Sequence, residues 1–287
     1  MTESDKTPAD TTTPVDTTSR PSACSLGALV AAPLLIVAGL WLVFHGDDGV
    51  AEPAPVASGT FSAEQRTAIE SIVKDYLIKN PEILLEVQSA LELKVAQQEA
   101  EKTKTLVAEH AKEIYHAPTS PVAGNPKGDI TVVEFFDYNC GYCRRGFSEV
   151  AKLVEQDKNV RVVFAELPIL GDDSVRAAHV ALAAKEQGKY WEVHSGLLSS
   201  SGKVNEAIAL KVAEKVGLDM EKLKADMKSP AVQAELDRVK GLADKLAING
   251  TPHFLVGDKA VPGAPDNLFD VIESHVADLR KSGCAYC

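Results

Sequence analysis

Two cysteines separated by two residues, Cys140 and Cys143, are the residues of this chain best suited to chemistry. They follow an apolar run at 131–136 and precede a helically spaced apolar stripe from Phe147 to Val154, which predicts a strand, a sharp turn and a helix. Cys140 then lies at the helix start, where unpaired N–H groups and the helix dipole should lower its pKa. The thiolate is the attacking species in disulfide exchange, and Cys143, one turn later, can close a ring with Cys140.

Glu134 is the third candidate, because it lies in the apolar strand six residues before Cys140. We expect it beneath the helix, where desolvation would raise its pKa and let it take and return the proton of Cys143. Two alternatives are half of a zinc site and a structural disulfide. A zinc site needs a second Cys/His pair at a suitable spacing, whereas the strand–turn–helix context favours redox chemistry.

Composition limits the classes of protein that the chain can represent. It has 287 residues, a formal net charge of −11 and 45% hydrophobic residues, which suffices for one good core with appendages or two small domains. The acidic balance argues against a nucleic-acid partner. Five cysteines are few for a disulfide-stapled scaffold, so at least one pair is expected to be reactive.

A second motif accompanies the first. Cys140-Gly-Tyr142-Cys143 and the loop Asn249-Gly-Thr251-Pro252 together resemble the DsbA-like thioredoxin-fold proteins of bacterial envelopes, and most of all the suppressor of copper sensitivity protein C (ScsC) group. The resemblance covers about residues 64–280. It implies an α/β thioredoxin fold with a helical insertion, no cofactor, and a cis-proline loop facing the CxxC that docks the substrate chain.

The resemblance gives further residues a role. Thr251 and Pro252 would dock the substrate through backbone groups beside the thiol, and Tyr142 would tune the thiol and touch the substrate. His253 either faces the CxxC or lies on the solvent side of a strand. The other histidines have no metal-ligand spacing, and we predict no metal site.

The amino-terminal part predicts a membrane anchor. Residues 22–44 carry no charge and are long enough to cross a bilayer as a helix, which favours an uncleaved anchor over a signal peptide. Lys6 and Arg20 precede this span, so the amino terminus should be cytoplasmic and the bulk of the chain extracytoplasmic. We therefore expect a single-pass protein of the bacterial inner membrane with its catalytic domain in the periplasm.

Residues 61–115 are helical in pattern and form a predicted stalk. Ser62 and Gln65 make a capping box, and Asn80-Pro81 should break the helix. A narrow apolar stripe follows, which is closer to a coiled-coil seam than to a core face. In the ScsC group such a region can drive oligomerisation, and the alternative is a helix packed on its own catalytic domain.

The predicted organisation runs in chain order. Strands are expected at 160–166, 253–256 and 260–262, the first parallel to the strand at 131–136, and a closing helix at 265–280. The domains are a disordered tail at 1–21, the anchor at 22–44, a linker at 45–60, the helical stalk at 61–115, the DsbA-like domain at 116–283 with its insertion at about 174–248, and a CxxC tail at 284–287.

These features predict a thiol–disulfide oxidoreductase acting on cysteine-containing protein substrates, an isomerase or reductase rather than an oxidase. It would need a membrane redox partner, DsbD-like for an isomerase and DsbB-like for an oxidase. The alternative function is a copper(I)-binding envelope protein with the CxxC pairs as ligands. The tail pair Cys284 and Cys287 could form a local disulfide, exchange with Cys140 and Cys143, bind a soft metal, or be inert.

Overall fold

A computed structural model describes residues 61–287. The predicted tail at 1–21, anchor at 22–44 and linker at 45–60 lie outside the described residues. From Phe61 onward, no helix combines the length and the apolar character needed to cross a membrane. The described residues divide into two units, one ending at Asp75 and one running from Tyr76 to Cys287.

The predicted stalk consists of two helices, α1 (Ala63–Lys79) and α2 (Glu82–Tyr115). The capping box is present, because the Ser62 N–H donates to Gln65 Oε1 at 2.8 Å and the Gln65 N–H donates to Ser62 Oγ at 3.3 Å. The break predicted at Asn80-Pro81 falls between the two helices.

Helix α2 has two parts with different surroundings. Its first half exposes the narrow apolar stripe, made by Leu84, Val87, Leu91 and Val95. Its last turns are buried at Val107, Ile114 and Tyr115, and the Tyr115 hydroxyl donates to the Gly257 carbonyl. The end of α2 is therefore part of the folded domain that follows it.

The sheet formed by the described residues has five strands in the order β1-β3-β2-β4-β5. They are β1 (Val122–Gly124), β2 (Ile130–Phe136), β3 (Val160–Glu166), β4 (His253–Val256) and β5 (Lys259–Pro262). Strands β2 and β3 are parallel, as predicted, and the other pairs are antiparallel. The short edge strand β1 was not predicted.

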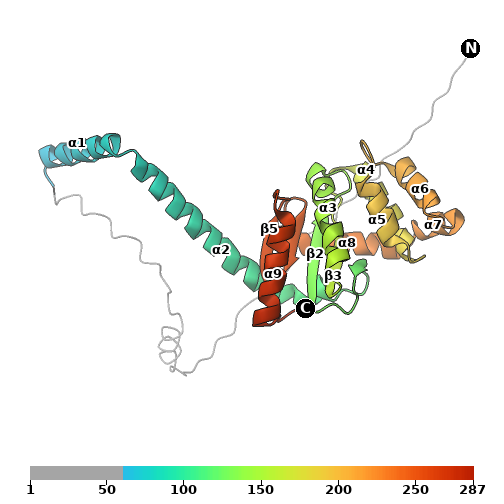
Figure 1. Cartoon of the computed structure of the whole chain (residues 1–287). Coiled ribbons are helices and arrows are strands. Elements are labelled where there is room, and N and C mark those ends of the chain that lie inside the picture. The colour runs from blue at the N-terminus through green and yellow to red at the C-terminus, as the bar shows by residue number, and fades with distance from the viewer. Residues whose placement is uncertain (1–60) are drawn as a thin grey trace, which may run out of the picture. The chain divides into compact units, whose positions relative to one another are not determined.

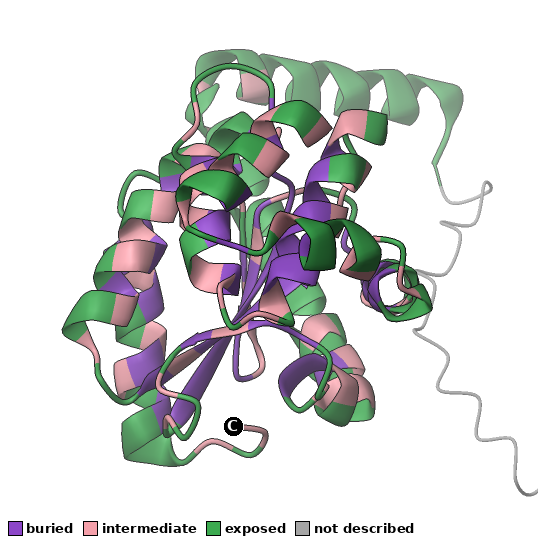
Figure 2. Ribbon diagram, turned by 90° about the vertical axis from the view of Figure 1, so that its right-hand side faces the viewer, coloured by how far each residue is buried: buried purple, intermediate pink, exposed green. Residues whose placement is uncertain are grey.

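Helices cover both faces of this sheet, and its strands are buried between them (Figure 2). On one face, α3 (Gly141–Gln156) and α9 (Leu268–Ser282) pack with most of the insertion on Val132, Phe136, Phe164 and Phe254. On the other, the end of α2 and part of α8 (Pro230–Lys245) pack on Val133, Phe135 and Leu255. Alternate β2 residues therefore face different layers, and even-numbered positions face α3.

The helical insertion begins after β3 and returns the chain to β4 (Figure 1). It contains α4 (Asp172–Lys185), α5 (Tyr190–Leu198), α6 (Glu206–Lys215), α7 (Met220–Asp226) and α8 (Pro230–Lys245). Side chains of Asn205, Asp219 and Ser229 cap three of these helices, which fixes where each begins.

Candidate active site

Cys140 and Cys143 lie where β2 gives way to α3. Cys140 is the N-cap residue of α3 with extended backbone (φ −77°, ψ 120°), and its N–H donates to the Asp137 carbonyl at 3.1 Å. The cap side chain is a thiol rather than a hydroxyl or carboxylate, so the first N–H groups of the helix face sulfur. Cys140 is 7% exposed, Cys143 is fully buried, and both carry free thiols.

The two thiols differ sharply in acidity. The pKa of Cys140 falls to about 5, although burial opposes this shift. The largest cause is the hydrogen bond from the Cys143 thiol. The Thr251 side chain and the N–H groups of Cys143 and Tyr142 lower the pKa further. Burial, the bond to Cys140 and the nearby Glu134 carboxylate raise the pKa of Cys143 far above its ordinary range. This contrast suits Cys140 to act as a nucleophile, while Cys143 keeps its own proton.

Glu134 faces α3 from β2, as predicted, and is 1% exposed. Across the described part of the chain, its Oε1 atom has no hydrogen-bond partner. Burial, with a further contribution from the Cys140 thiolate, raises the pKa of Glu134 to about 8. A neutral carboxyl with an unused oxygen below the thiols can accept a proton when the charge above it changes.

Glu134 should make stability fall with pH. Its pKa is about 8 in the folded chain and about 4.3 when unfolded, so the folded state holds the extra proton between these values. The contribution of Glu134 to the unfolding free energy should therefore decline through this window, while the lowered pKa of Cys140 contributes in the opposite direction in the reduced protein, so the comparison is made against a variant at each pH. Glu134→Gln should remove that loss. The unfolding free energy of the variant, relative to that of the wild type, should therefore increase by a few kcal/mol between about pH 5 and 8. Urea unfolding across pH measures this, and parallel curves would contradict it.

The loop before β4 closes over Cys140. The Thr251–Pro252 peptide bond is cis, and the Cys140 thiol donates to the Thr251 carbonyl at 3.1 Å. The Pro252 carbonyl accepts from the Gly263 N–H at 2.8 Å, which ties this loop to the end of the β4–β5 hairpin. The backbone next to Pro252 thus lies against the Cys140 sulfur.

Tyr142 and His253 have different positions relative to the thiols. Tyr142 is 58% exposed, and the Arg145 guanidinium lies 4.7 Å from its ring centroid. Arg145 also donates to the Ala264 carbonyl, which holds it beside Tyr142. His253 pairs with Phe135 in the sheet and shares its face, the one away from α3.

Sequence reasoning missed a buried polar network beside the thiols. Glu166 ends β3, and its Oε1 accepts from the hydroxyls of Tyr138 at 2.8 Å and Tyr190 at 2.9 Å. Tyr138 Oη also lies 3.2 Å from His194 Nδ1. The sequence signal that could have revealed this network is the carboxyl of Glu166 in a largely apolar strand, the same pattern that marked Glu134.

Comparison with known proteins decides the family. Residues 131–275 match the DSBA-like thioredoxin domain, and residues 65–98 match the copper resistance protein ScsC N-terminal domain. The chain belongs to the DSBA-like thioredoxin domain family. The first match contains both thiols, Glu134 and the cis-proline loop, and the second covers most of α1 and the first half of α2.

Relatives of this DSBA-like chain include solved structures of similar domains and a larger protein of which only one segment matches this chain. A thioredoxin-like oxidoreductase from Silicibacter pomeroyi DSS-3 is 49% identical, with a TM-score of 0.57 over 59% of this chain and 97% of that one. Proteus mirabilis ScsC in a transitional conformation is 28% identical, with a TM-score of 0.56 over 76% and 98%. The Na(+)/H(+) antiporter NhaA 3 of Salinispora tropica is 31% identical over 149 residues, 51% of this chain but only 23% of the antiporter.

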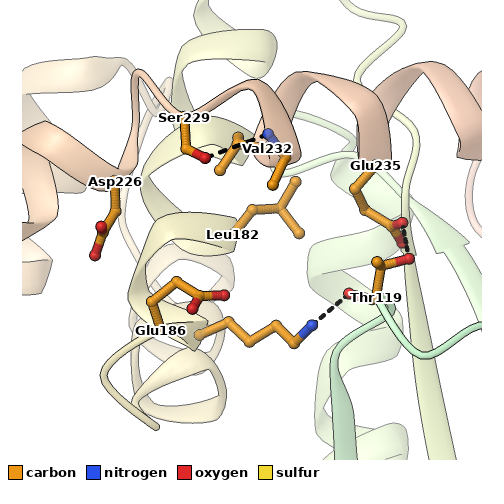
Figure 3. Close-up of a pocket in the computed structure, with 9 residues that line it drawn as sticks. Thr119, Leu182, Glu186, Asp226, Ser229, Val232 and Glu235 are labelled. Carbon is orange, nitrogen blue, oxygen red and sulfur yellow. Dashed lines mark hydrogen bonds between the residues drawn. The ribbon is translucent and has the colours of Figure 1, made fainter.

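The DSBA-like domain also has a hollow of about 200 Å³ away from its thiols, between α4, α8 and the segment before β1 (Figure 3). Lys185 donates across it to the Thr119 carbonyl, and the Thr119 hydroxyl donates to Glu235. No cysteine lines it. Within residues 61–287, no group of three or more His, Cys, Asp or Glu side chains is arranged to hold a metal ion.

The tail cysteines of the DSBA-like chain form a local disulfide, Cys284–Cys287, with a Cα–Cα distance of 5.6 Å. Arg280, one turn earlier, pairs with Asp129 before β2 and Asp157 after α3. The tail therefore lies at the opposite end of α3 from Cys140, about 24 Å away for 16 residues. The two pairs cannot exchange, or share a metal ion, within one chain.

The tail disulfide should contribute stability and not catalysis. Replacing both Cys284 and Cys287 with Ala should lower the unfolding free energy by about 1–2 kcal/mol, as expected for a very short closed loop. Disulfide-exchange activity should stay within about twofold, because the substitutions leave the other pair untouched. Urea unfolding and an exchange assay on the same sample check both points. Unchanged stability, or a tenfold loss of activity, would contradict this assignment.

Proposed function

We propose that this chain is an extracytoplasmic thiol–disulfide oxidoreductase that acts on protein disulfides through Cys140 and Cys143. The observation that carries the proposal is the contrast between the two thiols, one acidic at a helix start and one buried and protonated. The cis-proline loop beside Cys140 supports a protein substrate, because the adjacent backbone can pair with an extended chain.

The chemistry proceeds in two exchanges. The Cys140 thiolate attacks a substrate disulfide, so that a mixed disulfide forms and one substrate sulfur leaves as a thiolate. Cys143, after losing its proton to Glu134, attacks the Cys140 sulfur and releases the second substrate thiolate. The net result transfers two electrons to the substrate and leaves a Cys140–Cys143 disulfide. Oxidation of a substrate dithiol is the reverse of these steps.

An isomerase or reductase direction is favoured over an oxidase. The Gly-Tyr pair between the cysteines, Thr251 before the cis-proline and the stalk support it, through the resemblance to the ScsC group. Such an enzyme would be kept reduced by a DsbD-like membrane partner, and an oxidase would depend on a DsbB-like one. The apolar run at 22–44 supports a single-pass anchor in the bacterial inner membrane, with the catalytic domain in the periplasm.

The test of this function compares two activities of the purified protein. One assay measures reactivation of a protein with scrambled disulfides, and the other measures oxidation of the same protein in its reduced form. Strong reactivation with weak oxidation would establish an isomerase, and the reverse would establish an oxidase. Failure of both would overturn the proposal and turn attention to copper(I) binding by the reduced thiols.

We further infer that the stalk at 61–115 mediates self-association. The stripe at Leu84, Val87, Leu91 and Val95 is exposed at a spacing of three or four residues, and an apolar helical seam of this kind is buried by a second helix. The partner favoured here is another copy of the chain, because residues 65–98 match the ScsC N-terminal domain.

Substitutions in this stripe should change the oligomeric state. Leu84→Glu with Leu91→Glu should yield monomers, because four charged groups in a dimer, or more in a larger assembly, could not be buried together. Ser89→Glu with Ala100→Glu, which adds the same charge at exposed positions on the opposite face of α2, is the matched control. Light scattering measures the mass of each. A wild type that is already monomeric, or equal masses for both variants, would contradict self-association through this stripe.

A further inference from the structure

The three residues between β2 and Cys140, which we call the catalytic turn (137–139), are bound by the helical insertion. Asp137 Oδ1 accepts from the Ser174 hydroxyl of α4 at 2.8 Å. Asn139 pairs with the Val204 backbone, donating to its carbonyl at 2.9 Å and accepting from its N–H at 2.8 Å. The position of the turn therefore depends on segments more than thirty residues away in sequence.

Tyr138 is a second buried link between this turn and the insertion. Its hydroxyl bonds Glu166 and lies next to His194 of α5, and its side chain is 1% exposed. Its carbonyl accepts from Arg144 Nε at 2.9 Å, and Arg144 Nη1 donates to the Ser200 carbonyl just after α5 at 2.9 Å. Both ends of Tyr138 are thus fixed, one to the core and one to the first turn of α3.

We propose that Tyr138 is a positioning residue for thiol exchange, because its hydroxyl fixes the turn that presents the Cys140 thiol to the N–H groups at the start of α3. This inference rests on the proposed function of Cys140 and Cys143. Those N–H groups, on Tyr142 and Cys143, stabilise the thiolate only while the sulfur stays within hydrogen-bond reach. A turn that moves lets the sulfur leave that position.

Tyr190 supplies a matched control. Its hydroxyl donates to the same Glu166 oxygen, at 2.9 Å against 2.8 Å, and its side chain is also buried. Tyr190 lies in α5 and not in the catalytic turn, so its hydroxyl does not hold that turn. Burial raises the pKa of Glu166 to about 8, and Asp137 and Glu235 add to this, so at neutral pH either Phe variant removes a bond to a largely neutral carboxyl. Both variants should therefore lose stability, and Tyr138→Phe should lose somewhat more because its hydroxyl also lies 3.2 Å from His194 Nδ1.

The experiment compares Tyr138→Phe with Tyr190→Phe in the full reduced chain. The alkylation rate of Cys140 is followed from pH 3.5 to 9, and the equilibrium with glutathione is measured beside it. Tyr138→Phe should raise the Cys140 pKa by about half a unit or more and slow alkylation at pH 5 by about twofold or more. Tyr190→Phe should also lower the urea midpoint but leave the Cys140 pKa and the alkylation rate unchanged.

An equal change in the Cys140 pKa in the two variants, or no change in Tyr138→Phe, would overturn the positioning role. If Tyr138→Phe does not fold, Arg144→Lys replaces it, since this change keeps the charge but loses the bond from Nε to the Tyr138 carbonyl. The same upward shift is then expected, and an unchanged pKa would overturn the proposal. A wild type whose Cys140 titrates like a free cysteine would instead refute the proposed function.

Discussion

Cys140→Ser is expected to abolish disulfide exchange, with a loss of at least about a thousandfold in turnover. The hydroxyl that replaces the thiol does not ionise near neutral pH and cannot form a disulfide. Below about pH 5, where Cys140 is itself protonated, stability should change little, because serine is nearly isosteric and is a favourable N-cap residue in its own right. Reactivation of a scrambled-disulfide protein measures the loss.

Cys143→Ala is the control for this first prediction. It leaves the nucleophile in place and removes the resolving thiol, so mixed disulfides between Cys140 and the substrate should accumulate. These adducts are visible as a mass increase equal to the substrate, and a reductant should remove them. Full activity of Cys140→Ser, or adducts formed at another cysteine, would contradict the assigned roles.

Glu134→Gln should slow the second exchange by about a hundredfold, because Cys143 then loses its base. Formation of the mixed disulfide consumes the Cys140 thiolate, which is one of the two causes of the raised pKa of Glu134. The carboxyl should therefore become more acidic at that point and be ionised when Cys143 must lose its proton. Glutamine has the same shape but cannot accept that proton.

The pH profile separates this role from a structural one. The rate of resolution in the wild type should level off above the pKa of Glu134, at or below about 8, whereas the rate in Glu134→Gln should continue to rise with hydroxide. Rapid acid quenching with mass spectrometry follows the decay of the mixed disulfide. A variant with the wild-type rate and the same profile would show that Glu134 does not act as the base.

Local patterns predicted the elements that form the centre of the site. The apolar runs predicted β2 and β3, and the strands expected at 253–256 and 260–262 are present as β4 and β5. The capping box and the break at Asn80-Pro81 were also confirmed. Each of these signals lies within a few residues of the structure it specifies, which is why the sequence is sufficient there.

The features that sequence did not predict depend on distant partners. Strand β1 is short and contains Ala and Gly, and it is defined by backbone pairing with β3. The end of α2 is buried by residues more than a hundred positions later, which a local stripe cannot show. The Glu166 network joins Tyr138 and Tyr190, and only the folded sheet brings them together.

The tail cysteines illustrate a different limit. Their spacing allowed a disulfide, a metal site or exchange with the other pair, and the choice depends on where the end of α9 lies. The ion pairs of Arg280 fix that end against Asp129 and Asp157, far from Cys140. Spacing alone therefore described the chemistry available to the pair but not its location.

The acidity of Cys140 tests the central claim most directly. The measurement is the rate of iodoacetamide alkylation of the fully reduced chain from pH 3.5 to 9, with each modified cysteine mapped by mass spectrometry. Alkylation should occur at Cys140 in preference to Cys143 and reach half its maximal rate near pH 5. Half-maximal alkylation at the ordinary cysteine value of about 8.5, or earlier modification of Cys143, would contradict the account.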